Sequence, residues 1–547
     1  MKNLLIVLTF LVVTACQPEK KTGITIHLNS IGFLPSAKKT ASIVGEVKSF
    51  VLKREDDHAV VFKGETTVPV LQQDVDQHVC LADFSSFTEE GKYYLETQDG
   101  SRSVSVEISP TVYHDAFYTS MRAFYLWRCG TAVEGEHNGQ IFSHGPCHLH
   151  DGYDDFTGNP GQWRDGTGGW HDAGDYGKYT VNAGITLGML FLAWDQFQPQ
   201  LEQFPLNLPE TAPGFPDYLK ELKWETDWLF SMQYPDGSGR VSHKLTRLNF
   251  APFIAADADT ARRYFTEWSS AATASFTGMM AQAARYFQPY DADYAQKCLD
   301  AALLSYDFLQ KNPEYKRFEQ GDFKTGGYQS PDEDDRLWAA AELWETTDES
   351  KYLTDFEERA AAMDCQVDED WDWADVSNLA MFTYALSEKE GKTPEVSEKI
   401  TQNIVTVANE ITEKGRQDVY GRPLGGRYYW GCNGTVARQA INLQVANRLS
   451  PNPAYRQTAL DAISHLLGRN YYNRSFVTGL GISPAMHPHD RRSGADELTD
   501  PWPGYLVGGG HSATGWNDLE EDYATNEIAI NWQGALVYAL AGFLADE

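Results

Sequence analysis

The periodicity of the apolar residues changes at Pro110, and this change divides the chain into two kinds of structure. Between residues 24 and 108, apolar and polar residues alternate in short runs bounded by turn residues, as in Ile24–Leu28 and Val104–Ile108. A period of two is typical of strands with one buried face. We therefore predict a small β-sandwich over residues 24–109.

Beyond Pro110 the apolar residues recur at spacings of three and four, which predicts amphipathic helices. The clearest stretches are Val181–Phe197, Tyr218–Met232, Ser270–Phe287, Tyr294–Gln310, Leu337–Thr347, Ala374–Leu386, Val396–Thr412, Ala454–Leu467 and Ile528–Leu544. We expect everything after Pro110 to be helix and loop. Short and long connections alternate, which favours a toroid of helix pairs over a bundle, and no internal repeat indicates a solenoid. The expected fold is mainly α, with a helical domain over residues 110–547.

Composition limits the classes of partner. The 547-residue chain is 42% hydrophobic, which is enough for a large buried core. Its net charge of -32 argues against nucleic acid or an anionic membrane surface, because both attract basic proteins. Neutral substrates and cations remain as natural partners.

The N-terminus has the pattern of a secretory signal. A charged start, Met1–Asn3, precedes an apolar run that is too short to span a bilayer comfortably, and small residues then lead to Cys16. This pattern looks like a bacterial lipoprotein signal over residues 1–16, with lipidation of Cys16 and a tether over residues 17–23. Gln17 resembles the pattern of lipoproteins delivered to the outer membrane, on its periplasmic or cell-surface face. An ordinary secretory signal with an incidental cysteine is the alternative.

Cysteine and histidine residues suggest a metal site. Two thiols and two imidazoles, at Cys129, Cys147, His148 and His171, suit tetrahedral zinc. The alternative is a Cys129–Cys147 disulfide with two unrelated histidines. Because His171 directly precedes an acidic loop, the zinc would hold that loop in place and take no part in chemistry. The disulfide status of the other cysteines is left open; these are Cys80, Cys298, Cys365 and Cys432.

Two acidic segments are candidates for catalysis. Gly169–Tyr176 sets Asp172 and Asp175 three residues apart among glycines and aromatics, which suit close approach of a ligand and contact with sugar rings. Such a pair can hold and deprotonate a water. Downstream, Trp516–Glu527 is also rich in carboxylates. If folding brings Asp175 and Glu527 together, one can serve as base and the other as acid; for either motif alone, an Asx turn or a solvated loop is the alternative.

Motifs along most of the chain resemble glycoside hydrolase family nine, the inverting cellulases. They are Trp170–Tyr176, Ser270–Ala274, Trp338–Leu343, Leu466–Asn470, Pro488–Arg491, Pro501–Gly504 and Asn526–Trp532. The N-terminal segment looks like the immunoglobulin-like domain of one branch of that family, some of whose members carry a structural zinc. The resemblance implies an (α/α)6 toroid, an endo-β-1,4-glucanase and a monomer.

The resemblance also implies roles for single residues. It makes Asp175 the general base, Asp172 its partner on the attacking water, and Glu527 the general acid. It matches His489 and Asp518 to further active-site positions, and Arg491 or Arg492 to sugar binding. Inversion needs room for a water, with carboxyl groups about 6.5–9.5 Å apart. Glu527 must then be protonated near neutral pH, which burial against Trp532 or Tyr523 would achieve.

Aromatic residues in connections are candidate sugar platforms. They are Trp371, Trp373, Tyr429 and Trp430, each with core packing as the alternative. Departures from the family pattern at Ser483 and at Gln533–Gly534 bear on subsite detail rather than on the reaction.

Two acidic clusters could bind calcium, because hard cations take oxygen ligands. Ser493, Asp496 and Asp522 form the favoured set, and for Asp332–Asp335 a solvated loop is an equal alternative.

Two rival functions remain open at this stage. One is an exo-acting β-glucosidase or glucosaminidase of the same family, and the other is a non-catalytic glucan-binding lipoprotein. A zinc peptidase is disfavoured because the chain has no His-Glu-x-x-His motif. No cellulose-binding module is apparent, so we expect soluble or amorphous glucans or oligosaccharides as substrates.

Overall fold

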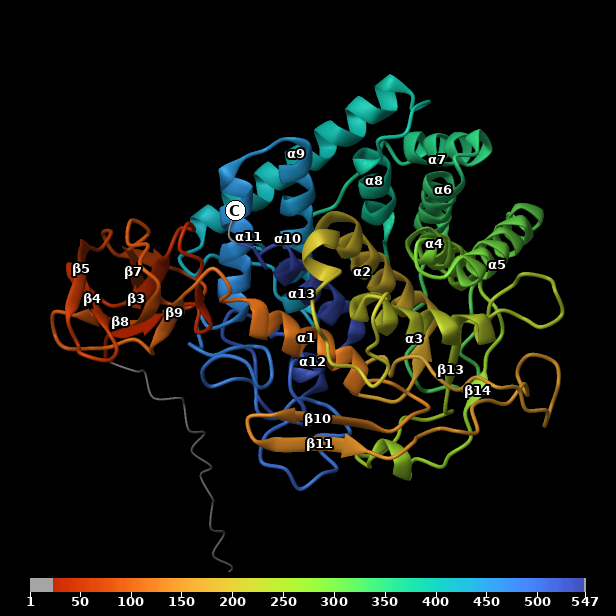
Figure 1. Cartoon of the computed structure of the whole chain (residues 1–547), viewed down its shortest axis with the longest axis horizontal. Helices are drawn as coiled ribbons and strands as arrows, with labels where there is room; N and C mark the ends of the chain where they lie inside the picture. Colours follow the sequence, from red (N-terminus) through yellow and green to blue (C-terminus); the bar gives the residue numbers. More distant parts are fainter. Residues whose placement is uncertain (1–22, 546–547) are drawn as a thin grey trace, which may run out of the picture.

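The computed structural model describes residues 23–545, which form a β-sandwich joined to a larger helical domain (Figure 1). The predicted signal, the lipidation site Cys16 and nearly all of the tether lie outside the described residues. Within residues 23–545, no helix combines the length and the hydropathy needed to cross a bilayer.

The first domain is built from two packed sheets. Its strands are β1 (Thr25–His27), β2 (Gly32–Phe33), β3 (Thr40–Val44), β4 (Ser49–Arg54), β5 (Val60–Glu65), β6 (Val70–Gln72), β7 (Gln77–Asp83), β8 (Gly91–Thr97) and β9 (Val106–Ile108). One sheet has the order β1-β3-β7-β6 and the other the order β2-β9-β8-β4-β5, with only the β2–β9 pair parallel among these strands. In β4, Phe50 and Leu52 are buried and their neighbours are partly exposed, as the period of two predicts.

The second domain is mainly helical. Its helices are α1 (His114–Leu126), α2 (Thr180–Leu201), α3 (Asp217–Met232), α4 (Ser270–Phe287), α5 (Ala292–Lys311), α6 (Glu333–Thr347), α7 (Ser350–Ala362), α8 (Ser377–Leu386), α9 (Pro394–Gln417), α10 (Cys432–Leu449), α11 (Pro453–Leu466), α12 (Tyr523–Asn526) and α13 (Ile530–Ala541). A single 3-10 turn, η1, spans Ala256–Ala258. The coarse prediction of a β-sandwich followed by a helical domain is confirmed.

The long helices form a closed circuit of contacts. α2 packs on α4, α4 on α6, α6 on α8, α8 on α10, α10 on α13, and α13 returns to α2. The other long helices pack outside this circuit, for example α5 on α4, α7 on α6 and α11 on α10. The inner helices are buried nearly all round; every residue of α13 is buried. Such helices carry little amphipathic pattern, because no face meets water.

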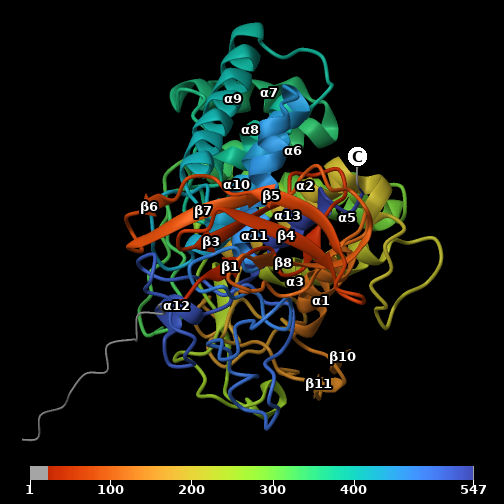
Figure 2. The same cartoon turned by 90° about the vertical axis from the view of Figure 1, so that its left-hand side faces the viewer.

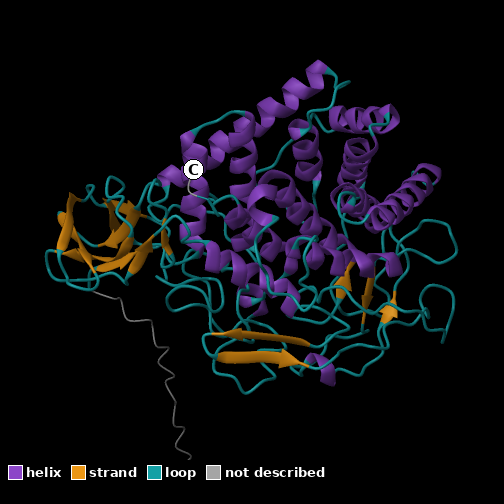
Figure 3. Cartoon of the chain, in the orientation of Figure 1, coloured by secondary structure: helices purple, strands orange, loops and turns teal. Residues whose placement is uncertain are grey.

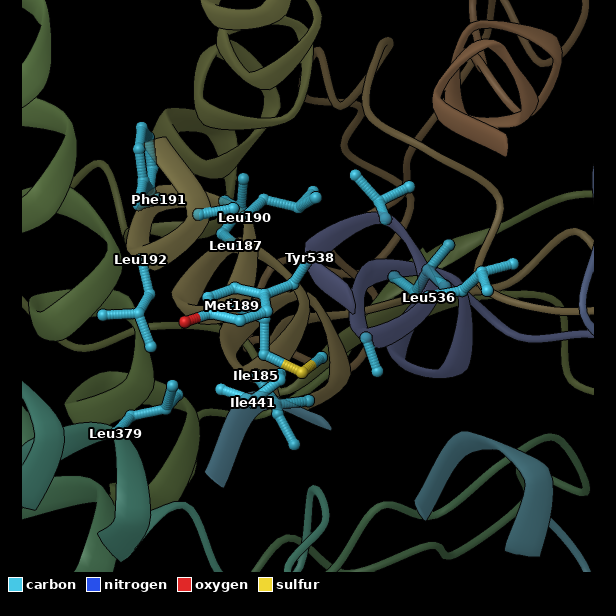
Figure 4. Packing of buried hydrophobic residues seen from close by; sticks show 14 of the residues in the cluster. Ile185, Leu187, Met189, Leu190, Phe191, Leu192, Leu379, Ile441, Leu536 and Tyr538 are labelled. Atoms are coloured by element: carbon cyan, nitrogen blue, oxygen red, sulfur yellow. The ribbon is translucent and has the colours of Figure 1, made fainter. Parts of the chain in front are cut away.

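The centre of the circuit is filled by aliphatic and aromatic side chains. Figure 4 shows Leu187 and Met189 of α2 close to Ile441 of α10 and Leu536 of α13. All four are fully buried, so they remove a large apolar area from water. This shared core fixes the ends of the inner helices, and those ends carry the site described below.

The expectation that only helix and loop follow Pro110 is wrong. A hairpin joins β10 (Val133–His137) to β11 (Gln140–His144), and a small sheet contains β12 (Lys178–Tyr179), β13 (Lys244–Thr246) and β14 (Tyr264–Phe265). These strands lie among the long loops below the helices in Figure 3. The hairpin turn is Asn138-Gly139, with both residues at positive φ. Asn-Gly is a strong hairpin signal, so local turn chemistry could have predicted it.

The sandwich packs on the side of the helical domain near α11, as Figure 2 shows from that side. The backbone N–H of Ser30 donates to the Leu467 carbonyl at 3.0 Å, and the Ser42 hydroxyl donates to the Val419 carbonyl at 2.5 Å. Arg469 donates from Nε to the Ser42 hydroxyl at 3.0 Å. Buried polar contacts of this kind fix the orientation of the two domains.

Candidate active site

Polar and aromatic side chains gather where loops enter the inner helices. The contributing segments are residues 169–179 before α2, 326–328 before α6, 371–373 before α8, 429–431 before α10 and 527–529 before α13. Because the inner helices share one core, their N-terminal ends meet at one side of the domain. Residues far apart in sequence are thereby brought to one site.

Backbone contacts join the two acidic segments directly. Ala173 pairs with Ala529, and the N–H of Ile530 donates to the Asp172 carbonyl at 2.8 Å. His489 pairs in parallel with Glu527. A Cβ on Gly174 would collide with the His489 carbonyl, so this close approach requires glycine. The expected meeting of the two segments therefore occurs.

Asp172 is held from both sides. Its Oδ1 accepts from the Asn182 side-chain amide at 2.7 Å, and its Oδ2 accepts from the Tyr328 hydroxyl at 2.7 Å. The side chain is 1% exposed. Burial, followed by the nearby Asp175 carboxylate, raises the pKa of Asp172 to about 8. Asp172 is therefore protonated at neutral pH.

Asp175 is also buried but has different partners. Its Oδ2 accepts from the Gly177 N–H at 3.0 Å and from the Tyr179 hydroxyl at 3.2 Å. Both donors stabilise the ionised form of a carboxylate. The two aspartates of one loop thus have different surroundings, which is the usual way in which a protein assigns different roles to similar groups.

Glu527 keeps some exposure to the site. Burial and the Asp175 carboxylate raise the pKa of Glu527 well above its usual value, and Arg491 only partly opposes this. This shift favours the protonated form of Glu527, as the sequence-based hypothesis requires. A protonated carboxyl can donate a proton to an oxygen placed beside it.

The acidic groups share a cavity of about 410 Å³. It is lined by Asp172, Ala173, Asp175, Tyr179, Phe250, Gly326, Gly327, Tyr328, Asp372, Trp373, Trp430, Glu527, Ala529, Asn531 and Trp532. Aromatic faces mixed with a few polar groups are typical of a saccharide site. Trp430 is 46% exposed, and its ring lies 5.6 Å from that of Tyr523.

The aromatic candidates divide into two groups. Trp373 and Trp430 line the cavity, as predicted. Trp371 is 1% exposed, and its indole N–H donates to Asn442 at 2.8 Å, so it belongs to the core. The Tyr429 hydroxyl is engaged by Asp370 and Thr435 and does not line the cavity.

The two candidate arginines also differ. Arg491 donates to the Gly174 carbonyl at 2.7 Å and to the Ala251 carbonyl at 2.9 Å, and it lowers the pKa of the neighbouring Glu527. Arg492 is 3% exposed and contacts Asp490 and the Tyr505 hydroxyl in the core. Its burial removes Arg492 as a sugar ligand.

His489 and Asp518 support the site from behind. The His489 ring lies 2.6 Å from the Glu520 carbonyl, and its backbone adjoins Glu527. Asp518 accepts from the N–H groups of Met486 and His487 and from Arg474. Burial raises the pKa of Asp518, but these donors outweigh it and hold the pKa below its usual value. Neither side chain lines the cavity, and Asp518 positions the 486–489 segment.

The predicted metal ligands come together. Within residues 23–545, one set of His, Cys, Asp and Glu side chains lies close enough together to share a metal ion. It consists of Cys129, Cys147, His148 and His171. Their ligand atoms lie within 4.8 Å of one another, and all four residues are buried. The six described cysteines are free, so the alternative of a Cys129–Cys147 disulfide is not formed.

The geometry of this group suits zinc. His171 Nε2 lies 3.3 Å from His148 Nδ1 and 3.9 Å from Cys147 Sγ. Tetrahedral zinc bonds imply separations of about 3.4 Å between two nitrogens and about 3.6 Å between nitrogen and sulfur. His148 Nε2 lies 3.5 Å from the Asp259 carboxylate, the outer partner that a metal-bound histidine commonly has.

Ionisation of the Cys129 thiol favours metal binding, whereas the hydrogen bond with Cys129 and burial raise the pKa of Cys147. Burial raises the pKa of Cys129, but the Cys147 hydrogen bond and the charges of Lys178, His171 and His148 together hold it well below its usual value. Burial lowers the pKa of His171 to about 3, which keeps this imidazole neutral. A thiolate and a neutral imidazole are the forms that bind metal.

The predicted calcium ligands have separate partners. Ser493 donates to Asp490, Asp496 accepts from the Trp502 indole, and Asp522 accepts from Asn517. In the other acidic segment, Asp332 pairs with Arg336 at 2.7 Å, and Asp334 and Asp335 are buried at the start of α6. That segment is therefore neither a solvated loop nor a cation site among the described residues.

Several residues at the site were missed by sequence reasoning. Tyr179, Tyr328, Phe250 and Asn531 line the cavity, and Asn182 supports Asp172. Tyr179 follows the acidic loop by only four residues, so proximity could have found it. Phe250 comes from a loop with no acidic neighbours that mark it as part of a site, and Tyr328 precedes an acidic segment, Asp332–Asp335, that was considered only for calcium.

Comparisons with known proteins agree on one family. Residues 113–540 match the model described as glycosyl hydrolase family 9, and residues 21–102 match a cellulase N-terminal ig-like domain. Endoglucanase D of Acetivibrio thermocellus is 53% identical over 521 residues, covering 95% of this chain and 83% of that protein.

Solved structures point the same way. The crystal structure of a metagenome-derived glycoside hydrolase family 9 endoglucanase superposes with a TM-score of 0.90 at 32% identity, covering 96% of this chain and 99% of that one. A Zn-binding triple mutant of the family 9 endoglucanase J30 superposes with a TM-score of 0.88 at 29% identity, covering 94% and 100%.

Proposed function

This chain belongs to glycosyl hydrolase family 9 and is an endoglucanase, and we propose that it cleaves β-1,4-glucosidic bonds by inversion, with Asp175 as general base and Glu527 as general acid. The observation that carries the proposal is the shared cavity. It holds Asp175, with donors that favour its ionised form, and Glu527, whose pKa is raised well above its usual value.

In the proposed reaction, a water lies between Asp175 and the anomeric carbon. Asp175 takes a proton from this water. At the same time the water oxygen bonds to the anomeric carbon, on the face opposite the leaving group. Glu527 gives its proton to the glycosidic oxygen as that bond breaks. Exchange with solvent then returns the proton from Asp175 to water and reprotonates Glu527, so the enzyme is unchanged.

We assign supporting roles to the neighbouring side chains. Neutral Asp172, held by Asn182 and Tyr328, is the partner of Asp175 on the attacking water. Trp373 and Trp430 offer faces on which glucose rings can stack. Arg491 adjoins Glu527 and is proposed to bind sugar hydroxyls beside the acid, and the His489 backbone, paired with Glu527, is proposed to hold the acid in place.

We also propose that the buried cysteine and histidine set holds a structural zinc. Cys129, Cys147, His148 and His171 have the donor set and the spacing that zinc prefers, and His171 Nε2 faces both Cys147 Sγ and His148 Nδ1. The ion would fix the backbone before Asp172, and the reaction needs no bond to it.

The finer description of the fold is a proposal as well. The closed circuit of inner helices with outer partners supports an (α/α)6 toroid. A boundary near Pro110, between β9 and α1, would separate it from the sandwich over residues 24–109.

Anchoring, oligomeric state and calcium remain predictions. We propose that Cys16 carries a lipid that holds the enzyme at the outer membrane, on its periplasmic or cell-surface face, and that the enzyme is a monomer. Detergent-phase partitioning of the full chain and of Cys16→Ser would test the anchor, with light scattering for the monomer. Calcium at Ser493, Asp496 and Asp522 is tested by calorimetric titration of Ca²⁺ into chelated protein.

The mechanism is tested by following the first product. We expect NMR of a cello-oligosaccharide digest to show the α-anomer before it mutarotates, and Asp175→Ala to abolish its release. A β-anomer as first product would overturn inversion. Product sizing on carboxymethylcellulose should give a ladder of oligomers; glucose alone would instead indicate exo action.

A further inference from the structure

A buried lysine lies behind the cavity, on the side of Asp175. Lys244 belongs to β13, is fully buried, and pairs in register with Tyr179 of β12. Its ammonium donates to the Gln320 amide oxygen at 2.7 Å, the Thr325 hydroxyl at 3.1 Å and the Gly326 carbonyl at 2.7 Å. All three acceptors are neutral, so the charge of this buried cation is not neutralised by any of them.

The Asp175 carboxylate, the proposed base, is an opposite charge that acts on Lys244. Burial lowers the pKa of Lys244 to about 7, and the Asp175 carboxylate opposes that shift. The rings of Tyr179, Phe318 and Phe323 lie 5.7, 5.1 and 5.0 Å from the ammonium. Ring faces at these distances stabilise a cation that water does not reach.

A hydrogen-bond chain connects the lysine to Asp175. Lys244 holds the carbonyl of Gly326, and the N–H of the same residue donates to the Tyr179 hydroxyl at 3.1 Å. The Tyr179 hydroxyl then donates to Asp175 Oδ2 at 3.2 Å. One residue, Gly326, therefore links the position of the lysine to the carboxylate through its carbonyl and its N–H.

The phenol at the centre of this chain has little freedom. A Cβ on Gly177 would lie 2.5 Å from the Tyr179 ring, and a Cβ on Gly326 would lie 3.2 Å from it. Two glycines on different segments thus let the backbone close on the ring. The ring also lies 4.9 Å from that of Tyr328, which holds Asp172.

We propose that Lys244 is a positioning residue for the reaction, which orients Asp175 through Gly326 and Tyr179 and places an ammonium group on the side of this base. The proposal rests on the role of Asp175 given above. Other ionisable groups near Asp175 are Asp172, Glu527 and His489, and the pKa values of the first two are raised. Arg491 lies beside Glu527, so Lys244 and Arg491 act on opposite members of the acid–base pair.

Lys244→Met is the primary test, in the full chain with a soluble cello-oligosaccharide. We expect kcat to fall roughly ten- to hundredfold with KM nearly unchanged, because small displacements of a catalytic group cost that much. Without the neighbouring cation an anion is harder to form, so the acid limb of the pH–rate profile moves to higher pH. Lys244→Arg keeps the charge and should restore the position of that limb.

Lys39→Met is the matched control. Lys39 is an equally buried lysine of the sandwich, and its ammonium donates to the carbonyls of Pro35 at 2.7 Å and Ala37 at 2.8 Å. We expect this control to lower Tm without moving the pH profile. If Lys244→Met lowers Tm and leaves the profile in place, as the control does, the positioning role is refuted.

Tyr179→Phe breaks the hydrogen-bond chain between Lys244 and Asp175 and leaves the lysine unchanged. It therefore tests the proposal even if Lys244→Met does not fold. We expect Tyr179→Phe to lower kcat and to move the acid limb of the pH–rate profile to higher pH. Tyr234→Phe removes a buried hydroxyl bonded to the Thr266 carbonyl, and we expect it to change neither kcat nor the acid limb. A wild-type profile for Tyr179→Phe would refute the proposal. If Asp175→Ala is inactive while the Lys244 and Tyr179 variants behave as wild type, only this inference fails; an active Asp175→Ala refutes the proposed function itself.

Discussion

Replacing each aspartate of the Gly169–Tyr176 loop by asparagine should separate their roles. Asp172 is protonated below about pH 8 because burial and Asp175 raise its pKa, so Asp172→Asn keeps both its charge and its shape there. Asp175→Asn instead removes the ionised base. The two substitutions are chemically identical, and the loop differs only in what surrounds each carboxyl.

The structure sets the magnitude for Asp172→Asn. The amide oxygen can still accept from Asn182, but the amide nitrogen cannot accept from the Tyr328 hydroxyl. The amide nitrogen can instead donate to the Tyr328 oxygen, but the Tyr328 O–H then lacks its acceptor, which costs about 1–3 kcal/mol. If that cost falls on the transition state, kcat drops by about 5- to 150-fold. Loss of the base in Asp175→Asn should cost about 10²–10⁴-fold.

The assay is kcat/KM on a cello-oligosaccharide from about pH 5 to about pH 9, with zinc content and circular dichroism as controls for folding. Above about pH 8 the wild type gains a second negative charge beside Asp175, and Asp172→Asn does not. The activity ratio of wild type to Asp172→Asn should thus be flat below about pH 7 and fall above about pH 8. A ratio that rises with pH, or equal losses for both variants near about pH 6, would refute the assignment.

Three further perturbations test other parts of the molecule. Removing zinc with a chelator should lower Tm by about 3–5 °C, which is the effect of losing a ligand present at about 100–1,000 times its Kd in a domain this large. Added zinc should restore the Tm. An unchanged Tm in calorimetry would show that the site holds no structural metal. Glu527→Gln lacks the transferable proton, so kcat on cello-oligosaccharides should fall about 10²–10⁴-fold. On an aryl cellobioside with a good leaving group, kcat should fall far less. Equal losses on both substrates would contradict an acid role. Gly434→Ala would drive a Cβ into the Trp532 indole at the cavity wall, costing about 1–3 kcal/mol of stability and weakening substrate binding; a wild-type KM and Tm would show that the wall can adjust.

The acidic residues could be selected as catalytic candidates from the sequence because each lies in a short motif of neighbouring residues. Asp172 and Asp175 stand together among glycines, and Glu527 precedes an apolar helical stretch that the structure confirms as α13. The change of period at Pro110 likewise follows from local pattern alone. Periodicity survives folding, so the coarse prediction of a β-sandwich followed by a helical domain was confirmed, whereas the roles of the acidic residues stay predictions.

Predictions that depended on burial were less successful. Trp371 and Arg492 carry the right chemistry for sugar binding, yet both are buried in the core and satisfied by protein partners. Sequence does not show which side of a loop faces the cavity. Tyr328 was missed for the same reason, since only tertiary structure brings its hydroxyl to Asp172. The short strands β12–β14 were missed because two or three residues cannot display a period.

Charge balance explains why the site needs this many supporting groups. Asp172, Asp175 and Glu527 line one largely buried cavity, and three adjacent carboxylates could not all ionise there. The raised pKa values of Asp172 and Glu527 favour their protonated forms, which reduces the negative charge beside the base. Lys244 lies on the side of Asp175, and Arg491 lies beside Glu527. The N-terminal ends of the inner helices also lie at the site, and they favour negative charge there. The acid–base pair thus depends on cations outside the acidic motifs, so changes at β13 should alter the pH dependence of catalysis without contact with substrate.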